Sequence, residues 1–159
     1  MKISSLQEYS KEQVINFFIQ QWGTTEMVIS SGVYDCSKLD GYVFLNDQRK
    51  IIGLITYIIR GEECEIVSLD SIEENHGIGT KLVQEVEKTA LAKKCKQVTL
   101  ITTNDNLRAL KFYQKRGYFL TKVYPNAVQI ARKYKPEIPF VGDGGIPIRD
   151  EIELQKVLV

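Results

Sequence analysis

The sequence has few of the residues that build metal sites and disulfide frameworks. It contains one histidine and three cysteines among 159 residues, and no two cysteines form a Cys-x-x-Cys pair. A structural zinc site needs four grouped Cys or His ligands, so we expect no metal. We also expect Cys36, Cys64 and Cys95 to be buried, reduced thiols, because no free histidine is available to activate a thiolate.

The sequence also lacks an excess of one charge and a long apolar run. Lys and Arg total 21 against 20 Asp and Glu, so no net field attracts nucleic acid or an anionic membrane. The longest mostly apolar stretch, Ile51–Ile59, is about half as long as a membrane-spanning helix, and the N-terminus has no secretory signal pattern. We therefore expect a cytoplasmic protein with neither a nucleic-acid nor a membrane partner.

The composition is that of one globular domain, with 43% hydrophobic and 26% charged residues. A chain of this length buries about 70% of the surface that it exposes when unfolded. No internal repeat, low-complexity tract or long linker divides it. We predict a single domain over residues 1–159.

Hydrophobic periodicity predicts helices alternating with short strands. Helical patterns cover Ser10–Trp22, Thr80–Lys94, Asn106–Arg116 and Ala127–Tyr134. Patterns typical of strands cover Tyr42–Leu45, Ile51–Ile59, Cys64–Leu69, Gln97–Thr103, Tyr118–Tyr124 and Glu151–Val159. Residues 27–40 have no clear period, and a second short helix is one interpretation of them. The early strands indicate an antiparallel meander, whereas the segment Cys64–Thr103 requires a parallel pair through a helix.

A Gly-x-Gly turn lies between a predicted strand and the helix at Thr80. Gly77 and Gly79 lack Cβ atoms, so a ligand can approach the backbone, and the first helical N–H groups favour phosphate oxygens. The turn has neither the third glycine of a dinucleotide fingerprint nor the Gly-Lys-Ser/Thr of a P-loop. It is therefore either a pyrophosphate site of another kind or a tight packing turn.

A second motif follows about 25 residues later and has the pattern Asn-x-x-Ala-x-x-Phe-Tyr-x-x-x-Gly-Phe/Tyr. Its members are Asn106, Ala109, Phe112, Tyr113, Gly117 and Tyr118. Together with Gly77-Ile78-Gly79, this motif resembles the GNAT superfamily of acyl-CoA-dependent N-acyltransferases. The resemblance covers roughly Gly41–Tyr124.

The resemblance implies an α+β fold, an α/β/α sandwich with a mixed, mostly antiparallel sheet flanked by helices. In that fold the sheet is splayed between its fourth and fifth strands, here Cys64–Leu69 and Gln97–Thr103. Acetyl-CoA would lie in the split as co-substrate. Residues 127–159 would form the acceptor-side helix, loop and final strand, and a homodimer is plausible.

The resemblance also implies which residues bind acetyl-CoA. The strand before the turn would pair its backbone with the pantetheine, the turn amides would hold the pyrophosphate, and two asparagines that also suit helix capping would contact the cofactor arm. The implied residues are Leu69, Asp70, Ser71, Asn75, His76, Gly77, Ile78, Gly79, Thr80, Asn104 and Asn106. The family has Gln or Arg where this sequence has Glu74, so one side-chain contact with the phosphate would be missing.

The implied reaction is attack of a neutral amine on a thioester carbonyl. Tyr113 matches the family tyrosine that protonates the departing thiolate, although it also fits a buried aromatic position on a helix. The candidate bases are the carboxylates Glu63, Glu65 and Asp70. Strand alternation places Glu63 and Glu65 on one face with Leu69, and we prefer Glu65 because Glu65-Ile66-x-x-Leu69 fits the common strand pattern.

We therefore expect an N-acetyltransferase that moves an acetyl group from acetyl-CoA to a primary amine of a small molecule or peptide by direct transfer. Tyr113 would be the acid and Glu65 the base. The alternative is a catalytically inactive CoA-binding sensor, for which Glu74 is the supporting feature. Four acidic residues near the C-terminus could attract a cationic acceptor, namely Glu137, Asp143, Asp150 and Glu151.

Overall fold

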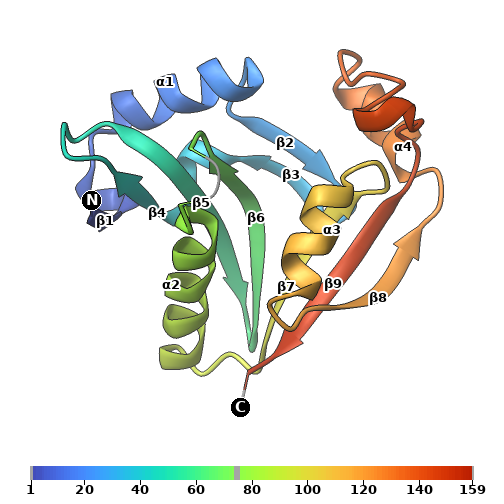
Figure 1. Ribbon diagram of the computed structural model, residues 1–159. Helices are drawn as coiled ribbons and strands as arrows, with labels where there is room; N and C mark the ends of the chain where they lie inside the picture. The colour runs from blue at the N-terminus through green and yellow to red at the C-terminus, as the bar shows by residue number, and fades with distance from the viewer. Residues whose placement is uncertain (1, 74–75, 159) are drawn as a thin grey trace. The chain divides into compact units, whose positions relative to one another are not determined.

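A computed structural model describes residues 2–73 and 76–158 of the chain (Figure 1). The chain forms two compact units. The first comprises residues 1–26, 35–98 and 158–159, and the second comprises residues 27–34 and 99–157. Each unit therefore combines segments that are far apart in the sequence.

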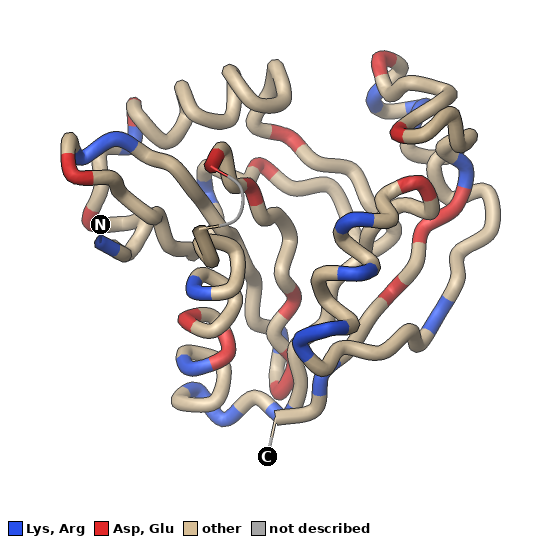
Figure 2. Tube along the Cα trace, in the orientation of Figure 1, with Lys and Arg blue, Asp and Glu red and all other residues tan. Residues whose placement is uncertain are grey.

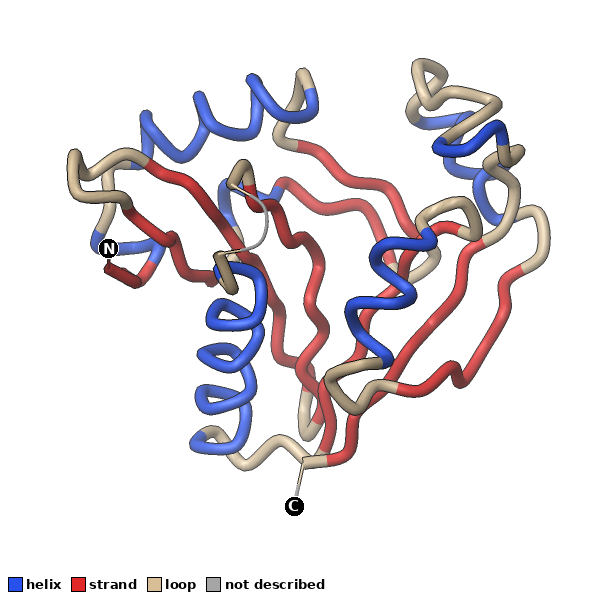
Figure 3. The backbone as a smooth tube through the Cα atoms, in the orientation of Figure 1, coloured by secondary structure: helices blue, strands red, loops and turns tan. Residues whose placement is uncertain are grey.

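The first unit contains an antiparallel sheet in the order β1-β4-β5-β6 (Figure 3). Its strands are β1 (Lys2–Ser5), β4 (Asp40–Leu45), β5 (Ile51–Arg60) and β6 (Glu63–Ser71). Its helices are α1 (Lys11–Trp22) and α2 (Ile78–Ala92), with short 3-10 turns at Leu6–Glu8 and Cys36–Lys38. The meander predicted from the early strands is confirmed.

Helix α1 begins and ends where its sequence signals lie. The Ser10 side chain accepts a hydrogen bond from the Gln13 N–H at the N-terminus, and Gly23 ends the helix in the left-handed region with φ 78°. Phe17 and Phe18 are buried, and the Phe18 ring lies 4.7 Å from the Trp22 ring.

Helix α2 packs tightly on β5 through its first turn. A Cβ added at Gly53 would lie 2.5 Å from Cγ2 of Ile78 and 3.1 Å from Cδ1 of Leu82. Both of these side chains are fully buried. The absence of a side chain at Gly53 therefore allows the N-terminal end of α2 to lie against the sheet.

A β-bulge interrupts β6 in its middle. Thr56 pairs with Ser68 whereas the next residue of β5, Tyr57, pairs with Ile66, so Val67 is an extra residue on β6. The bulge reverses the alternation of faces between Glu65 and Leu69. The prediction that these two residues share a face is therefore wrong.

The second unit contains strands in the order β7-β9-β8 and the hairpin β2-β3. Its strands are β2 (Glu26–Ile29), β3 (Gly32–Asp35), β7 (Gln97–Thr103), β8 (Phe119–Tyr124) and β9 (Glu151–Val157), although residues 26, 35 and 97–98 of these strands belong to the first unit. Its helices are α3 (Leu107–Gln114) and α4 (Ala127–Tyr134), and a 3-10 turn lies at Asp143–Gly145. Strands β8 and β9 pair antiparallel.

The hairpin β2-β3 overturns the interpretation of residues 27–40 as a helix. Its turn is held by Glu151, whose carboxylate accepts hydrogen bonds from the Ser30 N–H at 2.8 Å and the Ser30 hydroxyl at 2.5 Å. Glu151 is 121 residues away in the sequence, so no local pattern could indicate this contact.

The fold class expected from the sequence is confirmed as mixed α+β with a mostly antiparallel sheet and flanking helices. The helix motif also forms as expected, because Asn106 caps α3 and Gly117 has a left-handed φ of 94°. The splay of the sheet and the single domain over residues 1–159 stay predictions. No helix among the described residues is long and apolar enough to cross a membrane.

Candidate functional site

The Gly-x-Gly turn forms the start of α2 in the first unit. Gly77 is the N-cap residue and has a left-handed φ of 69°, and the first intrahelical bond runs from the Lys81 N–H to its carbonyl at 3.0 Å. A Cβ at Gly77 would meet no atom within 4 Å, so the turn is open on that side. The amides of Ile78 and Gly79 precede the first intrahelical bond, which is the arrangement that binds phosphate at a helix N-terminus.

The structure describes only some of the other residues predicted to bind the cofactor at the turn. Asn75 and Glu74 lie outside the described residues. His76 is described and exposed. The Ser71 hydroxyl, just before the turn, donates a hydrogen bond to the Glu73 carbonyl at 3.0 Å.

Asp70 is the carboxylate of β6 with the least complete set of partners. Its Oδ1 accepts a hydrogen bond from Trp22 Nε1 at 3.1 Å, whereas its buried Oδ2 has no partner among the described residues. Burial raises the pKa of the Asp70 carboxyl, and the Trp22 hydrogen bond opposes this shift in part.

The other two candidate bases have hydrogen-bond partners of their own. Glu65 is 3% exposed, and its Oε1 lies 2.8 Å from Arg60 Nη1 in an ion pair. Glu63 Oε2 accepts a hydrogen bond from Gln97 Nε2 at 2.8 Å. A proton transferred to Glu65 would weaken its ion pair, so the geometry does not favour Glu65 over its neighbours.

Tyr113 lies in α3 of the second unit and is 6% exposed. Its ring meets those of Phe112 and Tyr118 edge-on, at centroid distances of 5.0 Å and 5.4 Å. The guanidinium of Arg116 stacks 3.8 Å above the Phe112 ring. The aromatic part of the sequence motif therefore forms one packed cluster, which fixes where Tyr113 lies.

Charge is distributed differently on the two helices that carry the motifs (Figure 2). Helix α2 has both signs, and its Lys88 and Glu85 lie 3.9 Å apart. Helix α3 has Arg108 and Lys111 and no acidic residue. The sequence analysis missed this local positive charge because it considered only the balanced total.

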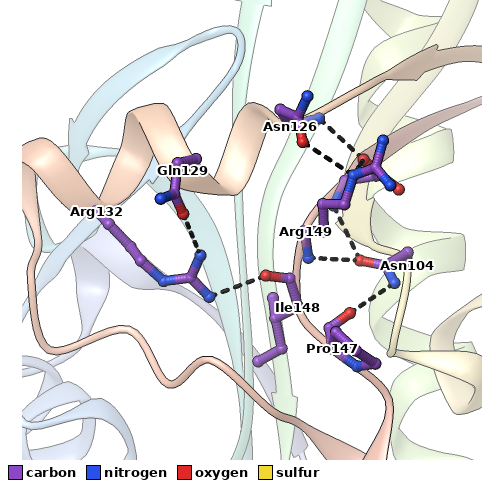
Figure 4. A network of polar contacts seen from close by, with 8 residues as sticks. Asn104, Asn126, Gln129, Arg132, Pro147, Ile148 and Arg149 are labelled. Carbon is purple, nitrogen blue, oxygen red and sulfur yellow. Dashed lines mark hydrogen bonds and ion pairs between the residues drawn. The ribbon is translucent and has the colours of Figure 1, made fainter.

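The side chains of the two asparagines expected at the cofactor arm both form hydrogen bonds within the second unit. The Asn106 Oδ1 caps α3 by accepting a hydrogen bond from the Ala109 N–H at 3.1 Å. The Asn104 amide donates to the Pro147 carbonyl at 2.9 Å and accepts from the N–H groups of Arg149 and Asp150, each at 3.0 Å (Figure 4). Asn104 therefore holds the segment before β9, a role that its spacing did not indicate.

Two of the four acidic residues expected to attract a cationic acceptor have internal partners instead. The Asp150 Oδ1 accepts from the Asn126 N–H at 2.9 Å and lies 3.2 Å from Arg149 Nε. Glu151 is 2% exposed and bound to Ser30. The interpretation is therefore wrong for the buried Glu151, whereas for Asp150, whose side chain is 24% exposed, it stays a prediction. Glu137 and Asp143 are exposed.

Arg132 of α4 organises the loop that precedes β9, and the sequence analysis did not single it out. Its guanidinium donates to the carbonyls of Ile138, Pro139 and Ile148 at 3.3, 2.6 and 2.9 Å. It also stacks 4.3 Å from the Phe140 ring. Figure 4 shows this guanidinium bridging α4 and Ile148.

Comparison with known proteins gives consistent similarities. Residues 7–118 match the profile of the acetyltransferase (GNAT) family. Two Bacillus subtilis relatives, uncharacterized proteins YxbD and YdhI, are each 54% identical, over 99% of both chains for YxbD and over 95% of this chain and 94% of the relative for YdhI.

Solved structures share the fold. A GNAT family acetyltransferase from Elizabethkingia anophelis with acetyl-CoA bound superposes with a TM-score of 0.65 and 26% identity, over 89% of this chain and 82% of that one. A Bacillus subtilis acetyltransferase in complex with CoA gives a TM-score of 0.68 at 17% identity, over 99% of both chains.

Proposed function

Because this chain belongs to the GNAT acetyltransferase family, we propose that it moves an acetyl group from acetyl-CoA to a primary amine of a small molecule or peptide by direct transfer. The observation that carries this proposal is the turn after β6, where Gly77 caps α2 in a left-handed conformation with open space beside it. The related Elizabethkingia enzyme, which has acetyl-CoA bound, supports the choice of cofactor.

The cofactor site combines β6 with the first turn of α2. The backbone of Leu69–Ser71 pairs with the pantetheine, and the amides of Gly77–Thr80 hold the pyrophosphate. This part of the chain suits the cofactor because a Cβ-free turn lets phosphate oxygens approach the helix N-terminus.

The chemistry requires a neutral amine and a protonated leaving group. Tyr113 donates its hydroxyl proton to the departing thiolate, the role of the family tyrosine that it matches in the motif after Asn106. The base is one of the carboxylates of β6, for which the sequence preference was Glu65. A backbone N–H of β6 donates to the oxyanion.

The test is a thiol-release assay with acetyl-CoA against a panel of amines, amino acids, polyamines and peptides, combined with a thermal-shift measurement of CoA binding. We expect release above background with one amine class. Binding without release across the panel would instead favour a CoA-binding sensor. Absence of both binding and release would contradict the proposal.

A further inference from the structure

The side chain of Asp70 faces away from α2. A Cβ at Gly53 would point to α2, and Gly53 pairs with Ser71, so this pair lies on the α2 face of the sheet. Side chains alternate along a strand, so the next pair, Leu54 with Asp70, points to the opposite face. The hydrogen bond from Trp22 at the end of α1 reaches Asp70 on that face.

The described residues near Asp70 on this face supply polar groups but no positive charge. The hydroxyls of Thr56 and Ser68 lie 2.6 Å apart and are buried. Both hydrogen-bond the thiol of Cys36, the titratable group near Asp70, and burial raises the pKa of that thiol to about 11, so it is neutral. No Lys or Arg among the described residues forms an ion pair with Asp70.

All three candidate carboxylates lie on this same face because of the bulge at Val67. Glu63 and Glu65 precede the bulge, and Asp70 follows it. Glu65 has Arg60 as its counter-ion and Glu63 has Gln97 as a donor. Asp70 differs from them because one of its oxygens is buried and still lacks a donor among the described residues.

We propose that Asp70 binds the ammonium group of the acceptor through Oδ2 and takes the proton that this group must lose. This inference rests on the proposed function and narrows it, because it makes the acceptor a cationic primary amine. The phosphate-binding end of the cofactor lies at α2, so an acceptor at Asp70 approaches from the opposite face. Trp22 is a positioning residue, since its N–H holds Oδ1 and leaves Oδ2 for the ammonium group.

The proton balance of the step is simple. The bound R–NH3⁺ gives one proton to the Asp70 carboxylate and becomes R–NH2. The nitrogen lone pair forms the C–N bond to the acetyl carbon while the C–S bond breaks. The second nitrogen proton is released when the amide forms. Nitrogen therefore loses two protons. The first passes to Asp70 and from there to water, and the second returns to Tyr113, which has given its own proton to sulfur.

Trp22 is the single tryptophan of the chain, so its fluorescence reports directly on Asp70. We expect ethylammonium chloride, added with saturating CoA, to change this fluorescence with a saturable dependence, whereas sodium chloride at equal ionic strength does not. The change should be absent in Asp70→Asn and unaltered in Glu12→Gln, which removes an exposed carboxylate of α1. A signal that does not saturate, or that persists in Asp70→Asn, would overturn the proposal.

A kinetic comparison separates proton transfer from a structural effect. Ethylamine is protonated at neutral pH, whereas trifluoroethylamine of similar size is largely neutral and needs no base. We expect Asp70→Asn to lower kcat/KM for ethylamine by about 10²-fold or more and for trifluoroethylamine by less than about 10-fold. Equal losses for both amines, with CoA binding unchanged, would show that Asp70 does not take the proton.

The two experiments distinguish failure of this inference from failure of the proposed function. If the wild-type protein releases thiol and Asp70→Asn matches it with ethylamine, the inference is wrong and the proposed function stands. If no amine releases thiol, the fluorescence titration still decides whether Asp70 binds an ammonium group.

Discussion

At the scale of single residues, the buried carboxyl of Asp70 is a candidate base that also lowers the stability of the folded protein when it is ionised. Because burial raises its pKa in the folded protein, folding favours the protonated form of the carboxyl. The associated stability is fully present below the unfolded pKa of about 4 and is lost as the pH rises through the folded value. Above that folded value the protein holds a buried charge that the Trp22 hydrogen bond compensates only in part.

We expect Asp70→Asn to raise the free energy of unfolding by about 1 kcal/mol near neutral pH, because it removes this charge while an oxygen still accepts from Trp22. The gain should disappear near pH 3, where the wild-type carboxyl is also neutral. Urea unfolding at the two pH values measures it, with Glu12→Gln as the control for loss of an exposed charge. A loss of stability at both pH values would contradict this account.

Tyr113 provides a second test at this scale. Tyr113→Phe keeps the ring that packs on Phe112 and Tyr118 but removes the hydroxyl. We expect kcat to fall about 10²-fold with little change in CoA affinity, because only the proton donor is lost. Phe112→Leu is the matched packing control. We expect it to lower the free energy of unfolding while changing kcat less than Tyr113→Phe does. Unchanged turnover in Tyr113→Phe would remove the acid role.

At the scale of elements, the contact between α2 and β5 places the phosphate-binding end of the helix. Gly53→Ala would put a methyl group 2.5 Å from the Ile78 side chain. We expect a loss of about 2 kcal/mol in unfolding free energy and weaker CoA binding, since the first turn of α2 must move. Gly61→Ala is the control, because a Cβ at this hairpin position would meet no atom within 4 Å. Its only cost is the backbone strain of an alanine at a φ of 59°. If CoA affinity is unchanged in Gly53→Ala, the position of this turn does not control binding.

The loop before β9 depends on the guanidinium of Arg132. Arg132→Lys keeps the charge, but a lysine cannot donate hydrogen bonds to three carbonyls and stack on the Phe140 ring at the same time. We expect faster hydrogen exchange at the amides of Gly142 and Ile148, both of which donate backbone hydrogen bonds within this loop. We also expect the free energy of unfolding to fall by about 1 kcal/mol. Lys133→Met, at an exposed position of the same helix, should leave exchange unaltered. Exchange that is equally slow in Arg132→Lys would show that the backbone bonds suffice.

At the scale of the whole molecule, the cofactor should contribute to stability through its binding energy. A ligand that binds only the folded protein adds about 2.7 kcal/mol at a concentration of 100 times its Kd. For a chain of 159 residues this corresponds to a rise in Tm of roughly 5 to 10 °C with CoA. Thermal unfolding with and without CoA measures this rise. No shift at saturating CoA would contradict the cofactor assignment.

Local sequence patterns predicted most elements because their signals lie within a few residues. Ser10 and Asn106 accept from amides three positions later, and Gly117, which follows the end of α3, has a positive φ. The same patterns failed where the deciding partner is distant. The turn of the β2-β3 hairpin depends on Glu151, so residues 27–40 could not be assigned from their own periodicity.

The sequence by itself determined the family, the approximate positions of the four helices and the Gly-x-Gly turn, since each of these rests on residue types at short, fixed spacings. Only the tertiary structure decided which carboxylate of β6 has a buried oxygen without a hydrogen-bond donor among the described residues. The single extra residue at Val67 moves Glu65 to the face opposite Leu69, and the partners Arg60, Gln97 and Trp22 set the environments of the three carboxylates. Burial and pairing are properties of the folded sheet, and therefore spacing along the chain does not predict them.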